Sequence, residues 1–344
     1  MVNYSYTKPL LCLPELAALL SDGDAGKIET SGAFKLPEHK TVTEVVADYL
    51  RELRRHALDC LEKELTSQIV ANTPIEVWVA VPAMWSNKAR DTLISAVKSA
   101  GFASRANDSI SLITEPEAAA LASFEDSVDT SKYFGIGDCI VVCDCGSTST
   151  DITGHTISEI SPLKLEECMD GIGLKVGTLS VIQNFSTWMQ REFGSAFTTL
   201  PTQRTGPGSP FIEQFEDLIT SHFRGAPMKK YHISLRMSVP DFTRYEYDEV
   251  IITGYVHLEN DIKKKVFILT VYSQELIEFY GPVVEKIITA VDQQSRRATR
   301  LFADGKKTGV ILVGALSSSP YLKTAFEKWV HGQEGVRLIL PSLG

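Results

Sequence analysis

The sequence predicts an α/β protein with two sets of strands, each followed by helices. Strand-like segments, IEVWVAVP at 75–82 and VILV at 310–313, each precede a helical pattern. The segment CIVVCDC at 139–145 is almost continuously apolar, as in a central strand covered on both faces. With 44% hydrophobic and 22% charged residues over 344 positions, the composition is that of a globular chain long enough for two domains.

The first part of the chain predicts helix, strand, helix, strand and helix. Apolar residues recur at helical spacing over 42–69, and a strand follows at 75–82. Ser86 is expected to cap the next helix, which Gly101 ends. The segment SLITEPEAAALASF at 111–124 predicts a short strand, a turn at Glu115 and Pro116, and an alanine-rich helix.

The second part begins with the strand at 139–145, the turn GSTST at 146–150 and two further strands, at 151–157 and 160–169. A helix is expected over 174–193, a flexible Pro/Gly/Ser/Thr connection over 199–210 and a helix over 211–223. Strands are expected within 231–271. A helix over 272–298, interrupted near Gly281 and Pro282, then precedes a strand, a turn and a helix at 309–330.

Charge and hydropathy limit the classes of partner and the location. The 34 Lys and Arg against 43 Asp and Glu give a formal charge of -9, which argues against broad capture of nucleic acid or of an anionic membrane. The longest apolar runs have the length of strands and are too short to span a membrane. A lone Lys8 and interrupting prolines make the N-terminus a poor signal peptide. We therefore expect a cytoplasmic protein.

Two interpretations of the segment VVCDCGSTSTDITG at 141–154 compete. Cys143 and Cys145 point to one face of a strand, where they suit either core packing or metal and redox chemistry; no His/Cys set with metal spacing follows them. In the other interpretation, Asp144 and Asp151 flank a turn of small residues whose N–H groups can approach a phosphate. Acids at both ends of such a turn would repel a phosphate unless Mg²⁺ lay between them. A surface hairpin is the simpler alternative.

Two other positions have the same ambiguity. Gly314 ends a strand and opens a Ser-rich turn, which suits either a nucleotide contact at a helix N-terminus or an ordinary turn with a serine cap and Pro320 in the first helical position. Glu115 could hold hydrated Mg²⁺ or orient water, or it could complement a helix dipole.

Five segments, taken in chain order, resemble the actin-like ATPase domain of the seventy-kilodalton heat-shock chaperones. They are VWVAVPAMWSNKARDTLISAVKSAGF, LITEPEAAALA, VVCDCGSTSTDIT, GPVVEKIITAV and VILVGALSSSPYL. The chain is most similar to the divergent group abundant in filamentous fungi and related to the vertebrate subfamily twelve. The resemblance covers most of residues 42–340. It implies a two-lobed, ribonuclease H-like fold that binds ATP or ADP with Mg²⁺ in a cleft between the lobes.

The resemblance also implies site residues. Asp144 and Asp151 match the two acids that act on Mg²⁺ and the attacking water, Glu115 matches an acid that helps to hold the hydrated metal, and Lys8 matches the catalytic lysine. The remaining matches concern nucleotide contacts: Gly146, Ser147, Thr148 and Ser149 in the phosphate turn, Gly171, Gly173 and Gly177 in the glycine-rich stretch, and Gly314 and Ala315 in the adenosine loop.

Several departures from the family pattern weaken the expected catalysis. Nothing matches the first phosphate loop, so the first lobe is expected to be incomplete, and the chain stops before the usual final helix. Ser147 and Thr148 replace glycines in the phosphate turn, and Leu174 replaces one in the glycine-rich stretch. Because phosphoryl transfer depends on positioning and electrostatics, ATP hydrolysis is expected to be weak or lost while binding survives.

We therefore expect a remnant of the first lobe over 1–135, and a second lobe over 136–344 with an inserted α+β subdomain at about 195–265. Client or co-chaperone proteins are the partners that the resemblance implies. The alternatives are a degenerate interaction module that binds no nucleotide and a sugar or acetate kinase of the same superfold.

Overall fold

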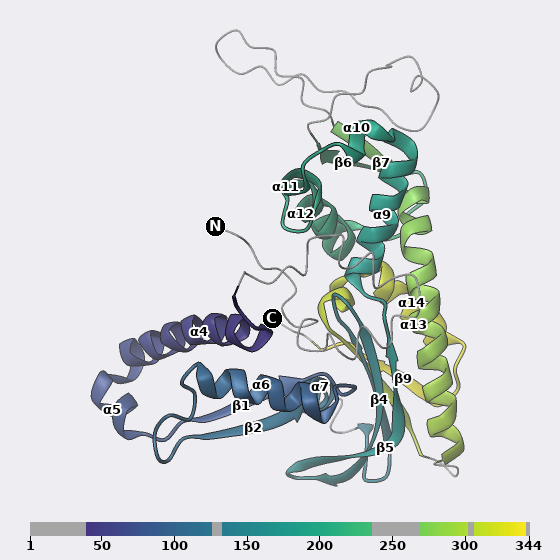
Figure 1. Ribbon diagram of the computed structural model, residues 1–344. Helices are drawn as coiled ribbons and strands as arrows, with labels where there is room; N and C mark the ends of the chain where they lie inside the picture. The colour runs from purple at the N-terminus through teal and green to yellow at the C-terminus, as the bar shows by residue number, and fades with distance from the viewer. Residues whose placement is uncertain (1–38, 126–132, 236–267, 302–305, 342–344) are drawn as a thin grey trace. The chain divides into compact units, whose positions relative to one another are not determined.

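The computed structural model describes residues 39–125, 133–235, 268–301 and 306–341. The chain divides into two compact units, Met1–Ala118 and Ala119–Gly344. Most of their elements are labelled in Figure 1, and each unit is described by itself.

The first unit begins with the helices α4 (Val42–Leu65) and α5 (Ser67–Asn72). Thr41 starts α4 through a capping box, because its hydroxyl accepts from the N–H of Glu44 and the Glu44 carboxylate accepts from the N–H of Thr41. The N-terminal half of α4 packs against α6 (Asn87–Ser99) around Val46, Ala47 and Ala96. The predicted helix over 42–69 is thus confirmed, with a break at Thr66.

The strands of this unit are β1 (Glu76–Val81) and β2 (Ser109–Thr114), which pair in parallel with α6 between them in the sequence. The Ser86 hydroxyl caps α6 by accepting from the N–H of Ala89, and Gly101 adopts a φ of 92° after the helix, both as predicted. The helix α7 (Glu115–Glu125) follows β2 directly. The predicted turn at Glu115 is therefore wrong, because Pro116 is tolerated in the first turn of a helix, where N–H groups lack intrahelical acceptors.

The second unit contains a mixed sheet in the order β5-β4-β3-β8-β9. Its strands are β3 (Cys139–Cys145), β4 (Thr150–Ile160), β5 (Leu163–Leu174), β8 (Thr308–Val313) and β9 (Val336–Ile339). The strands β3, β4 and β5 form the predicted antiparallel meander, β8 runs parallel to β3, and β9 runs parallel to β8. The predicted α/β class is confirmed. The strand β3 is central and almost entirely buried, as its apolar sequence indicates.

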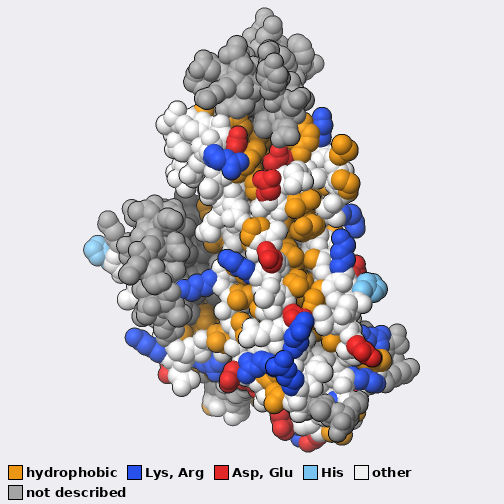
Figure 2. Space-filling model, turned by 90° about the vertical axis from the view of Figure 1, so that its right-hand side faces the viewer, with side chains coloured by type: hydrophobic (Ala, Val, Ile, Leu, Met, Phe, Trp, Pro, Cys, Tyr) orange, Lys and Arg blue, Asp and Glu red, His pale blue; other side chains and the backbone are white. Residues whose placement is uncertain are grey.

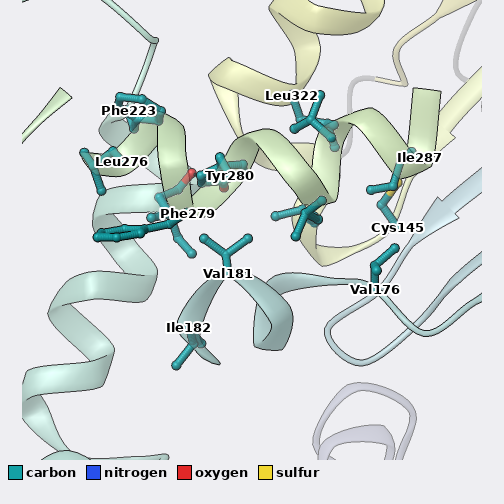
Figure 3. Packing of buried hydrophobic residues seen from close by; sticks show 14 of the residues in the cluster. Cys145, Val176, Val181, Ile182, Phe223, Leu276, Phe279, Tyr280, Ile287 and Leu322 are labelled. Carbon is teal, nitrogen blue, oxygen red and sulfur yellow. The ribbon is translucent and has the colours of Figure 1, made fainter. Parts of the chain in front are cut away.

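The larger core lies between this sheet and the helices α9 (Thr178–Phe193), α13 (Ser273–Leu301) and α14 (Pro320–His331). Figure 3 shows labelled side chains of α9, α13 and α14 in this core, with Cys145 at the end of β3 beside Ile287 of α13. Aromatic rings fill the centre of this core, where Phe185 stacks on Phe215 with ring centroids 3.9 Å apart. The helix α9 starts later than the predicted residue 174 because β5 continues to Leu174.

Smaller elements connect α9 to α13. These are α10 (Ser195–Thr198), α11 (Thr202–Thr205), α12 (Pro210–Asp217), a π-helical turn at Leu218–His222, β6 (Lys230–Ser234) and β7 (Ile268–Tyr272). The expected loop over 199–210 is partly helical, since it contains α11, and Ser209 caps α12 by accepting from the N–H of Ile212. The strands β6 and β7 form an antiparallel pair.

The helix α13 runs without interruption through Gly281 and Pro282, so the predicted break is wrong. Proline removes one backbone hydrogen bond, at a cost of about 3 kcal/mol. Buried side chains on both sides of the proline outweigh this cost, since each contributes about 1.5–3 kcal/mol. They are Leu276, Phe279, Tyr280, Val283, Val284 and Ile287. Among the described residues, no helix combines the length and apolar character needed to cross a membrane.

Candidate functional site

Asp144 and Asp151 are direct partners in the antiparallel pairing of β3 with β4. Directly opposite residues place their side chains on the same face of a sheet, with Cβ atoms about 4.5–5.5 Å apart. Asp151 is buried, with 7% of the residue exposed, and Asp144 is half-buried. Two like charges this close repel each other unless a cation or a proton is shared between them.

The turn between the two acids is tight. The N–H of Gly146 donates to the carbonyl of Ser149 at 2.9 Å, which closes the turn. Ser147 is exposed, and Thr148 and Ser149 are half-buried. The predicted order of strand, turn and strand is confirmed, but the amide of Gly146 is used within the turn itself.

The start of α9 packs against this turn. The N–H of Leu179 donates to the carbonyl of Ser147 at 2.8 Å, and the N–H of Thr178 donates to the carbonyl of Gly146 at 3.4 Å. A Cβ on Gly177 would lie 2.4 Å from the carbonyl oxygen of Gly146, so only glycine fits there. The first amides of α9 are therefore directed at the turn carbonyls.

The glycine-rich stretch borders the acid pair from β5. Gly173 is the direct partner of Asp151, and Gly171 lies two positions earlier on the same strand. The structure thus brings Gly173, Asp151 and Asp144 into one row across three neighbouring strands.

Gly314 borders Asp144 on the β8 side of β3, opposite to β4. It follows the last residue of β8, whose Val313 pairs with Asp144, and it has a φ of 91°. A Cβ on Gly314 would lie 2.4 Å from a carboxylate oxygen of Asp144, so its lack of a side chain lets the acid and the backbone approach each other. Ala315, which is exposed, begins a 3₁₀ turn.

The segment after Ala315 forms the strand-to-helix turn that the sequence predicts. The hydroxyl of Ser319 accepts from the N–H of Leu322, and Pro320 is the first residue of α14. A nucleotide contact at Gly314 and Ala315 stays a prediction.

Two candidate catalytic residues lie outside the described part of the second unit. Glu115 belongs to the first unit, where it is the first residue of α7 and complements the dipole of that helix. Lys8 lies outside the described residues. Their proposed roles stay predictions.

Cys143 and Cys145 point into the larger core, with their sulfur atoms 3.5 Å apart and both side chains fully buried. Burial raises the pKa of the Cys143 thiol, which keeps it protonated. The core-packing interpretation is the one that this geometry supports.

Two polar residues that the sequence did not place in the site continue the face of Asp151 along β4. Thr153 and His155 are buried, and a ring nitrogen of His155 lies 2.9 Å from the Thr153 hydroxyl. Burial lowers the pKa of His155, so its ring is neutral at neutral pH. In the sequence, polar residues alternate at positions 151, 153 and 155. This alternation indicates that the three side chains share one face of the strand.

The chemistry of this site is set by two adjacent carboxylates beside a turn of small residues. Among the residues that the structure describes, no three His, Cys, Asp or Glu side chains are grouped to hold a metal ion. Two carboxylates fit Mg²⁺ nevertheless, because proteins commonly hold it with one or two acids while water and phosphate oxygens supply the remaining ligands.

Comparison with known proteins agrees with the geometry in outline. Over 87% of its length, the chain is 25% identical to human heat shock 70 kDa protein 12B, and the match covers 50% of that protein. The chain thus spans about half the length of the curated relative that it matches. No family model matches it. The similarity supports a distant relationship to the actin-like ATPases of the Hsp70 family, with which the mixed sheet is consistent.

Proposed function

We propose that this chain is an Hsp70-like, actin-like protein that binds ATP or ADP with Mg²⁺ in a cleft between two lobes, and that it hydrolyses ATP weakly or not at all. The observation that carries the proposal is the direct pairing of Asp144 with Asp151 at the end of β3, beside the turn at 146–149. The distant similarity to heat shock 70 kDa protein 12B supports it.

In this proposal, Asp144 and Asp151 hold the metal ion, which neutralises charge on the nucleotide phosphates when it is bound. Ser147, Thr148 and Ser149 present the turn to the phosphates. Gly173 and Gly314 leave room beside the two acids, because neither adds a side chain next to the carboxylates.

Weak hydrolysis follows from the sequence of the site. Residues 147 and 148 carry side chains where the resembled family has glycine, and this restricts how closely the turn backbone can approach a phosphate. Lys8 and Glu115 are the candidates for charge stabilisation and for orienting water. Because phosphoryl transfer depends on positioning and electrostatics, we expect the side chains at 147 and 148 to lower the rate of hydrolysis.

Titration calorimetry with ATP and with ADP, each with and without Mg²⁺, tests this function. Binding should require Mg²⁺ and should weaken at least about tenfold in Asp144→Asn and in Asp151→Asn, because each change removes one charge from the metal site. Asp170→Asn is the matched control, since it removes the same charge from a β5 side chain that is 100% exposed. Unchanged binding in both site variants would reject the assignment.

One observation favours the second candidate, an interaction module without nucleotide. The first amides of α9 already donate to the turn carbonyls, so the amides of Thr178 and Leu179 are occupied without an anion. A thermal-shift measurement separates the two candidates. A ligand present at 100 times its dissociation constant stabilises the folded state by about 2.7 kcal/mol, whereas an interaction module shows no shift with ATP or ADP.

A further inference from the structure

Three cations lie at the end of the large sheet that is away from Asp144, and two of them lie over one tyrosine ring. Lys306 and Lys307 immediately precede β8, Arg337 lies near the start of β9, and Tyr133 lies shortly before β3. The strands β3, β8 and β9 are neighbours and run parallel, so these residues share one edge of the sheet. We call Tyr133, Lys306, Lys307 and Arg337 the cationic cluster.

Backbone and ring contacts fix the cations in place. The ammonium groups of Lys306 and Lys307 donate to the carbonyls of Ile136 and Tyr133, at 2.9 and 2.5 Å. The Lys307 ammonium and the Arg337 guanidinium also lie over the Tyr133 ring, at 4.1 and 4.4 Å from its centre. Since both distances end at the same ring centre, the two positive charges are at most 8.5 Å apart.

The tyrosine and the nearby acid are fixed as well. The Tyr133 ring makes an edge contact with the buried ring of Phe134, with centroids 4.9 Å apart. Asp138 is buried, and its carboxylate accepts from the backbone N–H groups of Gly135 and Lys307. This acid is therefore directed at the backbone and leaves the ammonium and guanidinium groups to other partners.

No carboxylate of the described residues forms an ion pair with Lys306, Lys307 or Arg337. Lys306 and Arg337 are exposed. Figure 2 shows further Lys and Arg side chains gathered over the lower, C-terminal end of α13, which carries the exposed Arg300. Arg296 and Arg297 of that helix are paired with Asp292 and Asp170, so the cations of the cluster itself form the local excess of positive charge on a chain whose formal charge is -9.

We propose that the cationic cluster binds an acidic segment, a short run of Asp and Glu side chains, of a partner protein. Neighbouring strands lie about 4.8 Å apart, so the cluster extends across roughly 10 Å of the sheet edge. Alternate side chains of an extended peptide are about 6.6–7 Å apart, which lets successive carboxylates reach different cations. The negative charge of the whole chain disfavours an extended nucleic acid and leaves a short acidic segment as the fitting partner.

Fluorescence anisotropy of a fluorescein-labelled hexaglutamate peptide, titrated with the full chain at low salt, tests the proposal. The double variant Lys306→Gln/Arg337→Gln should weaken binding about tenfold, and added salt should weaken binding by the wild type. Lys229→Gln/Lys230→Gln is the matched control, because it removes the same charge from two exposed lysines that lie over tyrosine rings, at the other sheet of this unit. The control should bind as the wild type does.

Four outcomes decide the question. The proposal is supported if peptide binding weakens only in the Lys306→Gln/Arg337→Gln variant and is restored in the charge-preserving variant Lys306→Arg/Arg337→Lys. The proposal is overturned if peptide binding weakens equally in the control variant, or if the wild type does not bind the peptide. Binding of inorganic tripolyphosphate at the cluster without binding of the peptide also overturns it, in favour of a small-anion site. Circular dichroism verifies folding, and Arg337→Gln alone replaces the double variant if that does not fold. Because the cluster lies away from Asp144, this result is independent of nucleotide binding.

Discussion

The backbone of Gly177 lies directly against the carbonyl oxygen of Gly146, so the start of α9 and the turn between β3 and β4 form one packed unit. A Cβ at position 177 would be 2.4 Å from this oxygen and 2.7 Å from the carbonyl oxygen of Ser147. Both neighbours are backbone atoms, which cannot rotate away as a side chain can. The geometry of the proposed phosphate turn therefore depends on a residue that is 31 positions further along the chain.

We expect Gly177→Ala to displace the turn and to lower the free energy of unfolding by about 1–3 kcal/mol, as overpacking does. Nucleotide binding should weaken in the same variant, because the turn moves. Urea denaturation measures the stability. Gly135→Ala is the control, since no heavy atom lies within 4 Å of its Cβ position, and it should change stability by less than about 0.5 kcal/mol. Equal effects of the two substitutions would contradict the packing described here.

The sequence predicts the hairpin and its acids well, because strand periodicity and turn composition are local signals. The pairing of Asp144 with Asp151 follows from the length of the turn between them. The contacts of Gly177 and Gly314 with this hairpin could not be predicted, since they join segments that are distant in the chain. Tertiary packing also explains the wrong break at Pro282: the local cost of proline is visible in the sequence, but the burial of the side chains that outweigh it is not.

The continuity of α13 leads to a prediction at Gly281. This residue is inside the helix, and no heavy atom lies within 4 Å of its Cβ position. Gly281→Ala should therefore raise the free energy of unfolding by about 0.5–1 kcal/mol, because glycine loses more backbone entropy in a helix than alanine does. Thermal or urea denaturation measures the gain. A destabilised Gly281→Ala would indicate that the helix does break at this position.

Burial of His155 predicts a pH dependence of stability. Because burial lowers the pKa of this histidine below its ordinary value, the unfolded chain takes up a proton before the folded chain does. Stability should therefore fall as the pH drops below about 6.5, by at most about 1.4 kcal/mol per pH unit for one proton, and this loss should level off below the folded-state pKa.

The slope of unfolding free energy against pH tests this assignment. His155→Gln should reduce the slope between about pH 6.5 and the lower, folded-state pKa, because the titrating ring is gone. An identical slope in wild type and His155→Gln would show that another group causes the pH dependence.

The cysteines should differ in reactivity according to their burial. A short pulse of iodoacetamide at about pH 8, followed by peptide mass spectrometry, should modify the exposed Cys60 and leave Cys143 and Cys145 unmodified. Burial raises the pKa of the Cys143 thiol, so the reactive thiolate does not form in the folded protein. In urea all three should react. Rapid modification of Cys143 in the folded protein would contradict core packing and favour the redox interpretation.

The two units should also differ in local stability. Among the described residues of the first unit, the core around Val46, Ala47 and Ala96 is small, and Trp78 on β1 is 59% exposed, whereas β3 in the second unit is central and almost fully buried. Because local opening is easier where little apolar surface is buried, amides of β1 should exchange hydrogen for deuterium faster than those of β3. Hydrogen-exchange mass spectrometry of the full chain measures this. Equal protection of β1 and β3 would show that the first unit is as well packed as the second.

The same difference in burial predicts the effect of two substitutions on the free energy of unfolding. Trp78→Ser should change stability by less than about 0.5 kcal/mol, while Phe185→Ala, in the large core, should cost about 3–5 kcal/mol.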